Sequence, residues 1–156
     1  MPLLQNQRKR IQHEVETRDW HWLYTGEPPK VTYLKPKEAL ELHEQIAIVN
    51  LQKNGFRITV NAEDPAAPAN IDLTSDRNGF LWELKDVTSK SSVRTQISRA
   101  RKKWYKLELK QPKRIVFSVG DSSAGYDELL EEATKRIRTG EEIILVSDSK
   151  LLRIKK

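Results

Sequence analysis

The sequence predicts an α/β fold in which a mixed central sheet is flanked by helices. Apolar residues recur at helical spacing in some blocks, while in others they alternate or run continuously as in strands. From residue 38 onward these blocks follow the order helix, strand, strand, strand, helix, strand, helix, strand, which is typical of α/β domains. The strand-helix-strand passage through residues 82–119 predicts local parallel pairing, because parallel strands need a crossover connection.

Composition narrows the class of protein. The 156 residues are enough for one domain with a full core, and the chain has no cysteine, which excludes disulfides and thiolate metal sites. Only three histidines are present, so oxygen ligands would hold any metal, which favours magnesium or manganese over structural zinc. No apolar run approaches membrane-spanning length, and no signal-peptide pattern opens the chain. The net charge of +6 favours a polyanionic partner.

Residues 1–37 are expected to be an N-terminal extension or linker, and residues 38–156 the main domain. The extension contains a basic amphipathic pattern and then the aromatic run 20–24, followed by glycine and prolines. Aromatic residues among basic ones can stack on nucleic-acid bases. The interpretation we favour is that these aromatics cover an edge of the domain, or that the segment joins it to a longer protein.

The first predicted helix spans residues 37–54 and is ended by Gly55. Leu40, Ala47 and Leu51 lie in one apolar row, in which Glu44 takes the remaining place. Burying a glutamate is costly unless a positive group meets it. Glu44 is therefore expected either at the edge of the core, reaching water, or facing a cation site.

The central feature is a hairpin formed by residues 70–73 and 80–86. A strand at 56–60 and a proline-rich loop at 61–69 precede it, and Asn78-Gly79 supplies its turn. Because side chains alternate along a strand, Glu83 and Lys85 share one face, and the other face is strongly apolar. If the hairpin pairs as the turn indicates, Asp72 lies beside Glu83. Two carboxylates and an amine there are suited to metal-assisted attack on a phosphodiester.

A basic helix is expected at about residues 92–108, after a serine cap. One face carries apolar residues at helical spacing, and between residues 90 and 114 the single acid Glu108 stands against ten lysines and arginines. Such a surface draws phosphates towards a site that acidic residues would otherwise make repulsive. The chain then predicts a strand at 114–119, a helix from 126 to 137 closed by Gly140, a strand at 142–147 and an edge strand at 151–154.

These pieces together resemble the PD-(D/E)XK, or restriction-endonuclease-like, nuclease superfamily. The resemblance covers roughly residues 38–119 and is carried by Glu44 on the leading helix, Asp72, the tripeptide Glu83-Leu84-Lys85 and Gln96 on the following helix. Within the superfamily, the chain is most similar to the C-terminal tRNase toxin domains of contact-dependent growth-inhibition proteins. It departs from the usual pattern in that Ile71, not proline, precedes Asp72.

The resemblance implies an αβββαβ core with an extra C-terminal helix and strand, and it implies roles for the site residues. Asp72, Glu83 and Glu44 would bind a divalent metal ion, magnesium or manganese in preference to zinc, and with Lys85 would be the catalytic set. The residues expected to bind substrate lie on the basic helix: Gln96, Arg94, Arg99 and Lys103.

The function expected is that of a metal-dependent endonuclease, a toxin-type RNase that cleaves tRNA. Two alternatives stay open. One is a DNA endonuclease of the same fold, and the other is a non-catalytic module that either binds nucleic acid or is a structural part of a phage or a secretion system. The toxin interpretation implies an acidic immunity protein as a partner, action in the cytoplasm, and delivery into a target cell within a larger secreted protein.

Overall fold

The computed structural model describes residues 29–75, 80–111, 113–119, 125–147 and 150–156. The predicted Asn78-Gly79 turn lies outside these residues, as does all of the predicted extension up to residue 28. The described chain forms a seven-stranded mixed sheet with three α-helices, which confirms the predicted α/β class. The elements in chain order are β1 (Lys30–Tyr33), the short 3-10 helix η1 (Lys37–Ala39), α3 (Leu42–Lys53), β2 (Arg57–Val60), β3 (Leu73–Ser75), β4 (Leu81–Val87), α4 (Lys90–Lys106), β5 (Lys113–Val119), α5 (Tyr126–Arg136), β6 (Glu141–Val146) and β7 (Leu151–Lys155).

The strands lie in the sheet in the same order as in the chain, from β1 to β7. Strands β2, β3 and β4 form an antiparallel meander, β4, β5 and β6 are parallel, and β7 returns antiparallel at one edge. The parallel pairing of β4 with β5 across α4 confirms the predicted crossover. At the other edge β1, which lies within the predicted extension, pairs in parallel with β2, so that Tyr33 stands beside Val60.

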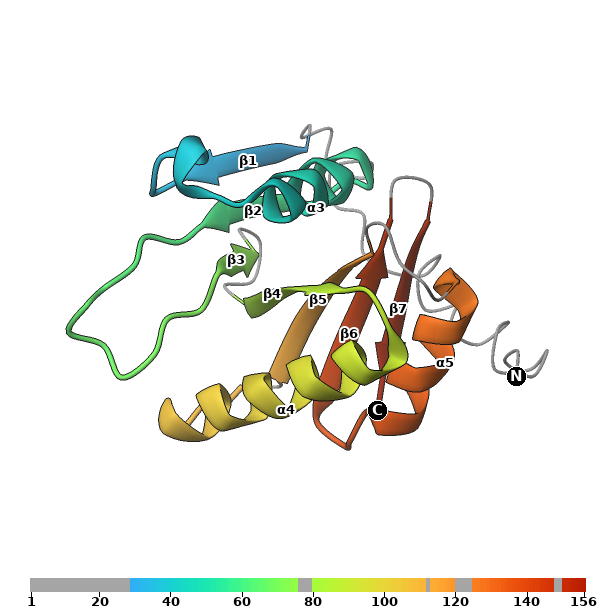
Figure 1. The fold of residues 1–156 in the computed structure, drawn as a ribbon. Coiled ribbons are helices and arrows are strands. Elements are labelled where there is room, and N and C mark those ends of the chain that lie inside the picture. Colours follow the sequence, from blue (N-terminus) through green and yellow to red (C-terminus); the bar gives the residue numbers. More distant parts are fainter. Residues whose placement is uncertain (1–28, 76–79, 112, 120–124, 148–149) are drawn as a thin grey trace.

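Helices cover both faces of the sheet (Figure 1): α3 lies on one face, and α4 and α5 lie on the other. The alternating side chains of β4 divide between two buried clusters accordingly. Trp82 and Leu84 pack in the α3 cluster, and Val87 packs in the cluster beneath α4 and α5. Glu83 and Lys85 share the parity of Val87, so their side chains belong to the α4 face, as the sequence pattern predicts.

The first helix begins later than predicted. Residues 37–39 form only the turn η1, Leu40 is extended, and α3 starts after Glu41. A capping box explains the start, because the Glu44 Oε1 atom accepts a hydrogen bond from the Glu41 backbone N–H at 3.0 Å. The end is as predicted, with Gly55 at a φ of 91° immediately after the C-cap.

Helix α4 is also fixed at its start by a reciprocal cap. The Ser89 hydroxyl accepts a hydrogen bond from the Ser92 N–H at 3.1 Å, and the Ser92 hydroxyl accepts one from the Ser89 N–H at 3.0 Å. Val93, Ile97, Ala100 and Trp104 then bury one stripe of the helix against the sheet. The cap and the stripe set the rotation of α4, and this rotation decides which basic side chains reach β4.

Candidate active site

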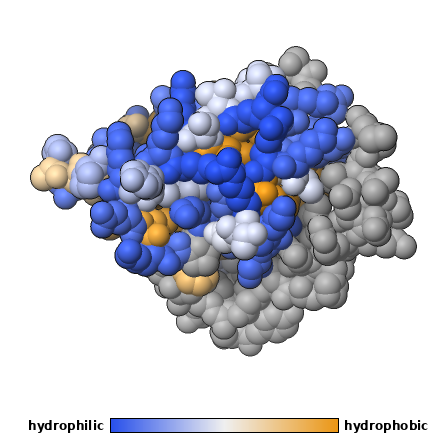
Figure 2. Space-filling model, turned by 90° about the horizontal axis from the view of Figure 1, so that it is seen from below, coloured by the Kyte–Doolittle hydropathy of each residue, from blue (hydrophilic) through white to orange (hydrophobic). Residues whose placement is uncertain are grey.

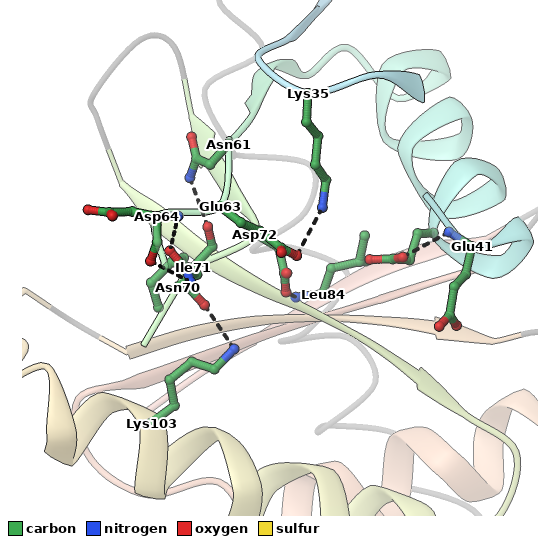
Figure 3. Close-up of polar contacts among 11 residues, drawn as sticks. Lys35, Glu41, Asn61, Glu63, Asp64, Asn70, Ile71, Asp72, Leu84 and Lys103 are labelled. Carbon is green, nitrogen blue, oxygen red and sulfur yellow. Dashed lines mark hydrogen bonds and ion pairs between the residues drawn. The ribbon is translucent and has the colours of Figure 1, made fainter. Parts of the chain in front are cut away.

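The β3–β4 hairpin brings Asp72 to Glu83. Leu73 pairs with Trp82 in the antiparallel register, so the next position on each strand sets Asp72 beside Glu83. The Asp72 Oδ2 atom accepts a hydrogen bond from the Leu84 backbone N–H at 2.8 Å, which ties the carboxylate to β4 (Figure 3). The juxtaposition that the sequence predicted for these two acids is therefore present.

Asn61, at the end of β2, holds the chain around Asp72 in place. Its backbone N–H donates to the Asp72 carbonyl at 2.9 Å, and its side-chain amide donates to the Ile71 carbonyl at 3.1 Å. The amide oxygen of Asn61 accepts a hydrogen bond from the Thr74 hydroxyl at 2.9 Å. These three hydrogen bonds of Asn61 tie the segment that contains Asp72 to the end of β2, although Asp72 lies just outside β3.

Glu83 is completely buried and meets two amines. Its Oε2 atom lies 2.7 Å from the Lys103 Nζ atom on α4 and 3.6 Å from the Lys85 Nζ atom on β4. Lys103 also donates to the Asn70 carbonyl at 2.9 Å, so one amine joins the hairpin, its preceding loop and α4. The Oε1 atom of Glu83 is buried without a hydrogen-bond partner within the described part of the chain.

The pKa values of both carboxyl groups are raised, chiefly because the groups are buried. Burial raises the pKa of Asp72, and the hydrogen bond from Leu84 and the charges of Lys103 and Lys85 offset part of that rise. Burial also raises the pKa of Glu83, and the neighbouring Asp72 raises it further, against the lowering effect of the two lysines. A positive charge bound between the two acids would lower the pKa values of both carboxyl groups.

A pocket of about 270 Å³ opens onto Asp72. Its wall contains the loop that leads into the hairpin, and Lys35 and Lys103 bring positive charge to it. Figure 3 shows Lys35 and Lys103 reaching this region from different parts of the chain. Lys35 forms an ion pair with Glu63 at 3.7 Å. The residues lining the pocket are Lys35, Asn61, Ala62, Glu63, Asn70, Ile71, Asp72 and Lys103.

Glu44 does not join Asp72 and Glu83 in a three-acid metal site. Its Oε1 atom caps α3, and α3 covers the face of the sheet opposite to that of Glu83. Among the described residues, no three histidine or acidic side chains are grouped closely enough to hold a metal ion. Glu44 is still near enough to Asp72 for its charge to raise the pKa of that carboxyl.

The predicted substrate-binding residues of α4 separate into different places. Lys103 enters the site, whereas Arg94 turns to α5, where its Nε atom lies 3.5 Å from the Glu132 carboxylate. Gln96 lies two helical turns before Lys103 on the same stripe, with a buried Oε1 atom that has no partner in the described structure. Arg99 is exposed on the helix surface.

Lys35, Asn61 and Asn70 belong to the site, although the sequence patterns did not single them out. Lys35 reaches the pocket because β1 pairs with β2, and no local motif marks that pairing. Asn61 carried a signal in retrospect, since a polar residue directly after an alternating strand is suited to hold the loop that follows.

The residues present fit a divalent cation held by two carboxylates. Asp72 and Glu83 are adjacent, both are raised in pKa, and Glu83 offers a buried oxygen with no described partner. Magnesium is commonly held by one or two carboxylates, with water completing its octahedral shell. The amines of Lys85 and Lys103 beside Glu83, and the pocket that opens onto Asp72, would leave room for an anionic group at such a cation.

The described residues include no helix with the length and apolar character needed to cross a membrane. No family model matches the chain, and comparisons with curated proteins and with solved structures find no match either. Inference about function therefore rests on the geometry of Asp72, Glu83, Lys85 and Lys103.

Proposed function

We propose that the protein is a divalent-metal-dependent endonuclease, and specifically a toxin-type RNase that cleaves tRNA. The observation that carries the proposal is the state of Glu83, which is wholly buried, lies beside a second acid and has one oxygen without a described partner. A protein gains nothing in stability from such an arrangement, because an unpaired buried carboxylate oxygen is costly. Groups of this kind are concentrated at functional sites.

In this function each residue of the site would have a separate role. Asp72 and Glu83 would hold the metal ion, which supplies Lewis-acid polarisation of a phosphoryl oxygen and lowers the pKa of a bound water. Lys85 would orient the attacking water and balance negative charge as the phosphorus centre gains a fifth oxygen. Lys103 would hold the Asn70 carbonyl and Glu83 together, which keeps the second acid beside the loop that leads to Asp72.

Two further features support the nuclease over other phosphoryl chemistry. The order α3-β2-β3-β4-α4-β5 agrees with the αβββαβ core expected of a restriction-endonuclease-like fold. The basic α4 runs beside the acids and would bind the phosphates that flank the cleaved bond. The choice of RNA rests on the resemblance to growth-inhibition toxins, which also suggests an acidic immunity protein, delivery within a larger secreted protein and action in the cytoplasm.

A second candidate is a module that binds nucleic acid without cutting it. The specific observation in its favour is the 2.7 Å ion pair between Lys103 and Glu83, since this amine already offsets part of the acidic charge that a cation would otherwise neutralise. Cleavage distinguishes the two candidates, and the nucleic acid that is cut distinguishes an RNase from a DNA endonuclease.

The test is incubation of the purified protein with total tRNA and, separately, plasmid DNA, with magnesium or manganese and with excess chelator. We expect tRNA fragments only when metal is present. Glu83→Gln should reduce the cleavage rate by about 10³-fold or more, equivalent to about 4 kcal/mol in the activation barrier. The variant should still bind tRNA.

Glu131→Gln is the matched control, because Glu131 is also a buried glutamate but lies on α5, away from the hairpin. It should cut at a rate close to that of the wild type. Full cleavage in chelator would exclude the metal mechanism, and equal rates for Glu83→Gln and the wild type would exclude this site.

A further inference from the structure

Tyr105, near the C-terminal end of α4, is the most exposed large hydrophobic residue in the described part of the chain, at 85%. The neighbouring Trp104 is only 1% exposed and packs under the helix, so the two aromatic rings, about 100° apart around α4, lie in different surroundings. The exposed ring therefore contributes little to the core. Its surroundings indicate a different use.

The end of α4 is shaped so that the chain folds back beside the ring. Glu108 takes a left-handed conformation with a φ of 49°. Its N–H donates to the Tyr105 carbonyl at 3.1 Å, and the Leu109 N–H donates to the Trp104 carbonyl at 3.2 Å, which together form a Schellman motif. Leu109 packs on the core, and Lys110 after it lines the same hollow as Tyr105.

Two hollows meet at Tyr105. One has a volume of about 500 Å³ and the other about 590 Å³, and both are lined by Arg101, Tyr105 and Arg138. Each lies within the range of roughly 300–1,000 Å³ that is usual for sites binding small organic groups. The tyrosine therefore stands between two surface depressions, each large enough for a planar ring.

The charge around these hollows is positive. Arg101 neutralises the buried Glu141 with two hydrogen bonds of 2.8 Å and also donates to the Arg136 carbonyl at 2.7 Å. Five other cationic side chains line the hollows and have no ion-pair partner among the described residues: Lys102, Lys106, Lys110, Lys113 and Arg138. Figure 2, which views the molecule from the α4 side, shows mostly hydrophilic side chains over the coloured part of this face.

We propose that Tyr105 is a stacking platform for an unpaired base of single-stranded nucleic acid, with Lys102, Lys106 and Arg138 binding the adjacent phosphates. This inference rests on the proposed function and specifies its substrate as a strand with accessible base faces. Tyr105 follows Lys103 by two residues, about 200° around the helix, so the platform and the lysine that contacts Glu83 lie on opposite flanks of α4, whose diameter with side chains is roughly 10–12 Å. A single strand crossing α4 can contact both.

The exposed ring of Tyr105 favours single-stranded nucleic acid over an acidic polypeptide as the ligand. Charge alone would suit either, but an exposed planar ring that borders two hollows matches the face of a base, and stacking of this kind contributes about 1–3 kcal/mol per base. Paired bases in a duplex keep their faces covered, so duplex binding would depend on the lysines and not on the tyrosine.

Binding of a fluorescent oligouridine of about 12 nucleotides, measured by anisotropy in excess chelator, tests the proposal. Because no cleavage occurs without metal under the proposed mechanism, the result does not depend on catalysis. Tyr105→Ala should weaken binding roughly 5- to 150-fold. Tyr105→Phe, the matched control, should bind within about two-fold of the wild type, since it keeps the ring.

Two companion measurements separate stacking from charge. A blunt RNA duplex should bind Tyr105→Ala and the wild type equally. Lys106→Gln should lower the salt dependence of oligouridine binding by about 0.7 in the logarithmic slope, whereas Tyr105→Ala should leave that slope unchanged.

Equal binding of oligouridine by Tyr105→Ala and the wild type would overturn the platform, as would an equal loss for duplex and single strand. Polyglutamate binding that depends on Tyr105, with no binding of oligouridine, would instead assign the surface to an acidic protein. If the wild type binds in a Tyr105-dependent way but cuts neither RNA nor DNA, the platform stands and the nuclease proposal fails.

Discussion

Glu83 on β4 and Glu142 on β6 are both buried glutamates in the same sheet, but they are held differently. Both oxygens of Glu142 have a guanidinium partner, Arg114 at 3.0 Å and Arg153 on the other side. Arg114 is itself placed with its guanidinium carbon 3.5 Å from the centroid of the Phe80 ring. Glu83 has two amines on one oxygen, and its other oxygen has no described partner.

The difference teaches which acid is structural. A guanidinium is planar and presents several donors in a fixed arrangement, so two arginines can saturate one carboxylate and fix its position. A lysine amine is a point charge on a flexible stem, and it can move aside while remaining nearby. Glu142 is therefore fixed within the fold by two arginines, whereas Glu83 keeps one oxygen without a described partner and a counter-charge on a flexible stem, as the proposed cation site would require.

The largest expected effect tests the structural half of this comparison. Glu142→Gln should lower the free energy of unfolding by about 3–5 kcal/mol, because it leaves Arg114 and Arg153 without their anionic partner in a buried place. Urea unfolding followed by tryptophan fluorescence measures the change. Glu83→Gln is the contrasting variant, and we expect it to be at least as stable as the wild type at neutral pH, because the pKa of Glu83 is raised. Equal destabilisation by the two substitutions would erase the distinction.

The second effect concerns a cation as the missing partner. Magnesium or manganese should stabilise the wild type by about 2.7 kcal/mol when the free ion is at about 100 times its dissociation constant. The increase in melting temperature should disappear in Glu83→Gln and Asp72→Asn. Glu142→Gln should show the same metal-induced increase in melting temperature, although its melting temperature without metal should be lower than that of the wild type. A metal-induced shift that survives loss of both Asp72 and Glu83 would place the ion elsewhere.

The smallest expected effect is the change in the free energy of unfolding with pH. Because the pKa values of Asp72 and Glu83 are raised on folding, the native state holds these protons more tightly than the unfolded chain. Their contribution to stability is therefore largest below the unfolded pKa values and falls as pH rises through the folded ones, by at most about 1.4 kcal/mol per pH unit for each group. Urea midpoints between about pH 4 and about pH 8 should fall less steeply in the Asp72→Asn, Glu83→Gln double variant. A slope as steep as that of the wild type would show that other groups control it.

Much of the fold could be predicted because its signals are local. The apolar stripe of α4, the continuous apolar run of β5 and the glycines after α3 and before β6 each report on their own segment. Asp72 and Glu83 could be paired for the same reason, since a short hairpin fixes their register. Strand β1 could not be found in this way, because its four residues gain their structure from β2, more than twenty positions later.

The rest of the site depends on contacts that no spacing encodes. The apolar row predicted correctly that Glu44 lies on a helix. Such a row does not show which face of the sheet the helix covers, and it does not show that the Glu44 carboxylate caps the helix. Lys103 was expected to meet phosphate, whereas its amine meets Glu83 and a backbone carbonyl. The rotation of α4 about its axis decides that outcome, and tertiary packing sets the rotation.

The order of the strands has a consequence for assembly. Since each strand pairs with the one before it in the chain, strands can join the sheet in chain order, and no described strand has to insert between two that are already joined. The Asp72–Glu83 pair is complete once β4 has been added, although Lys103 reaches it only after α4 folds back over that strand. The two acids can therefore meet without α4, whereas the amine that restrains Glu83 cannot reach it unless α4 is in place.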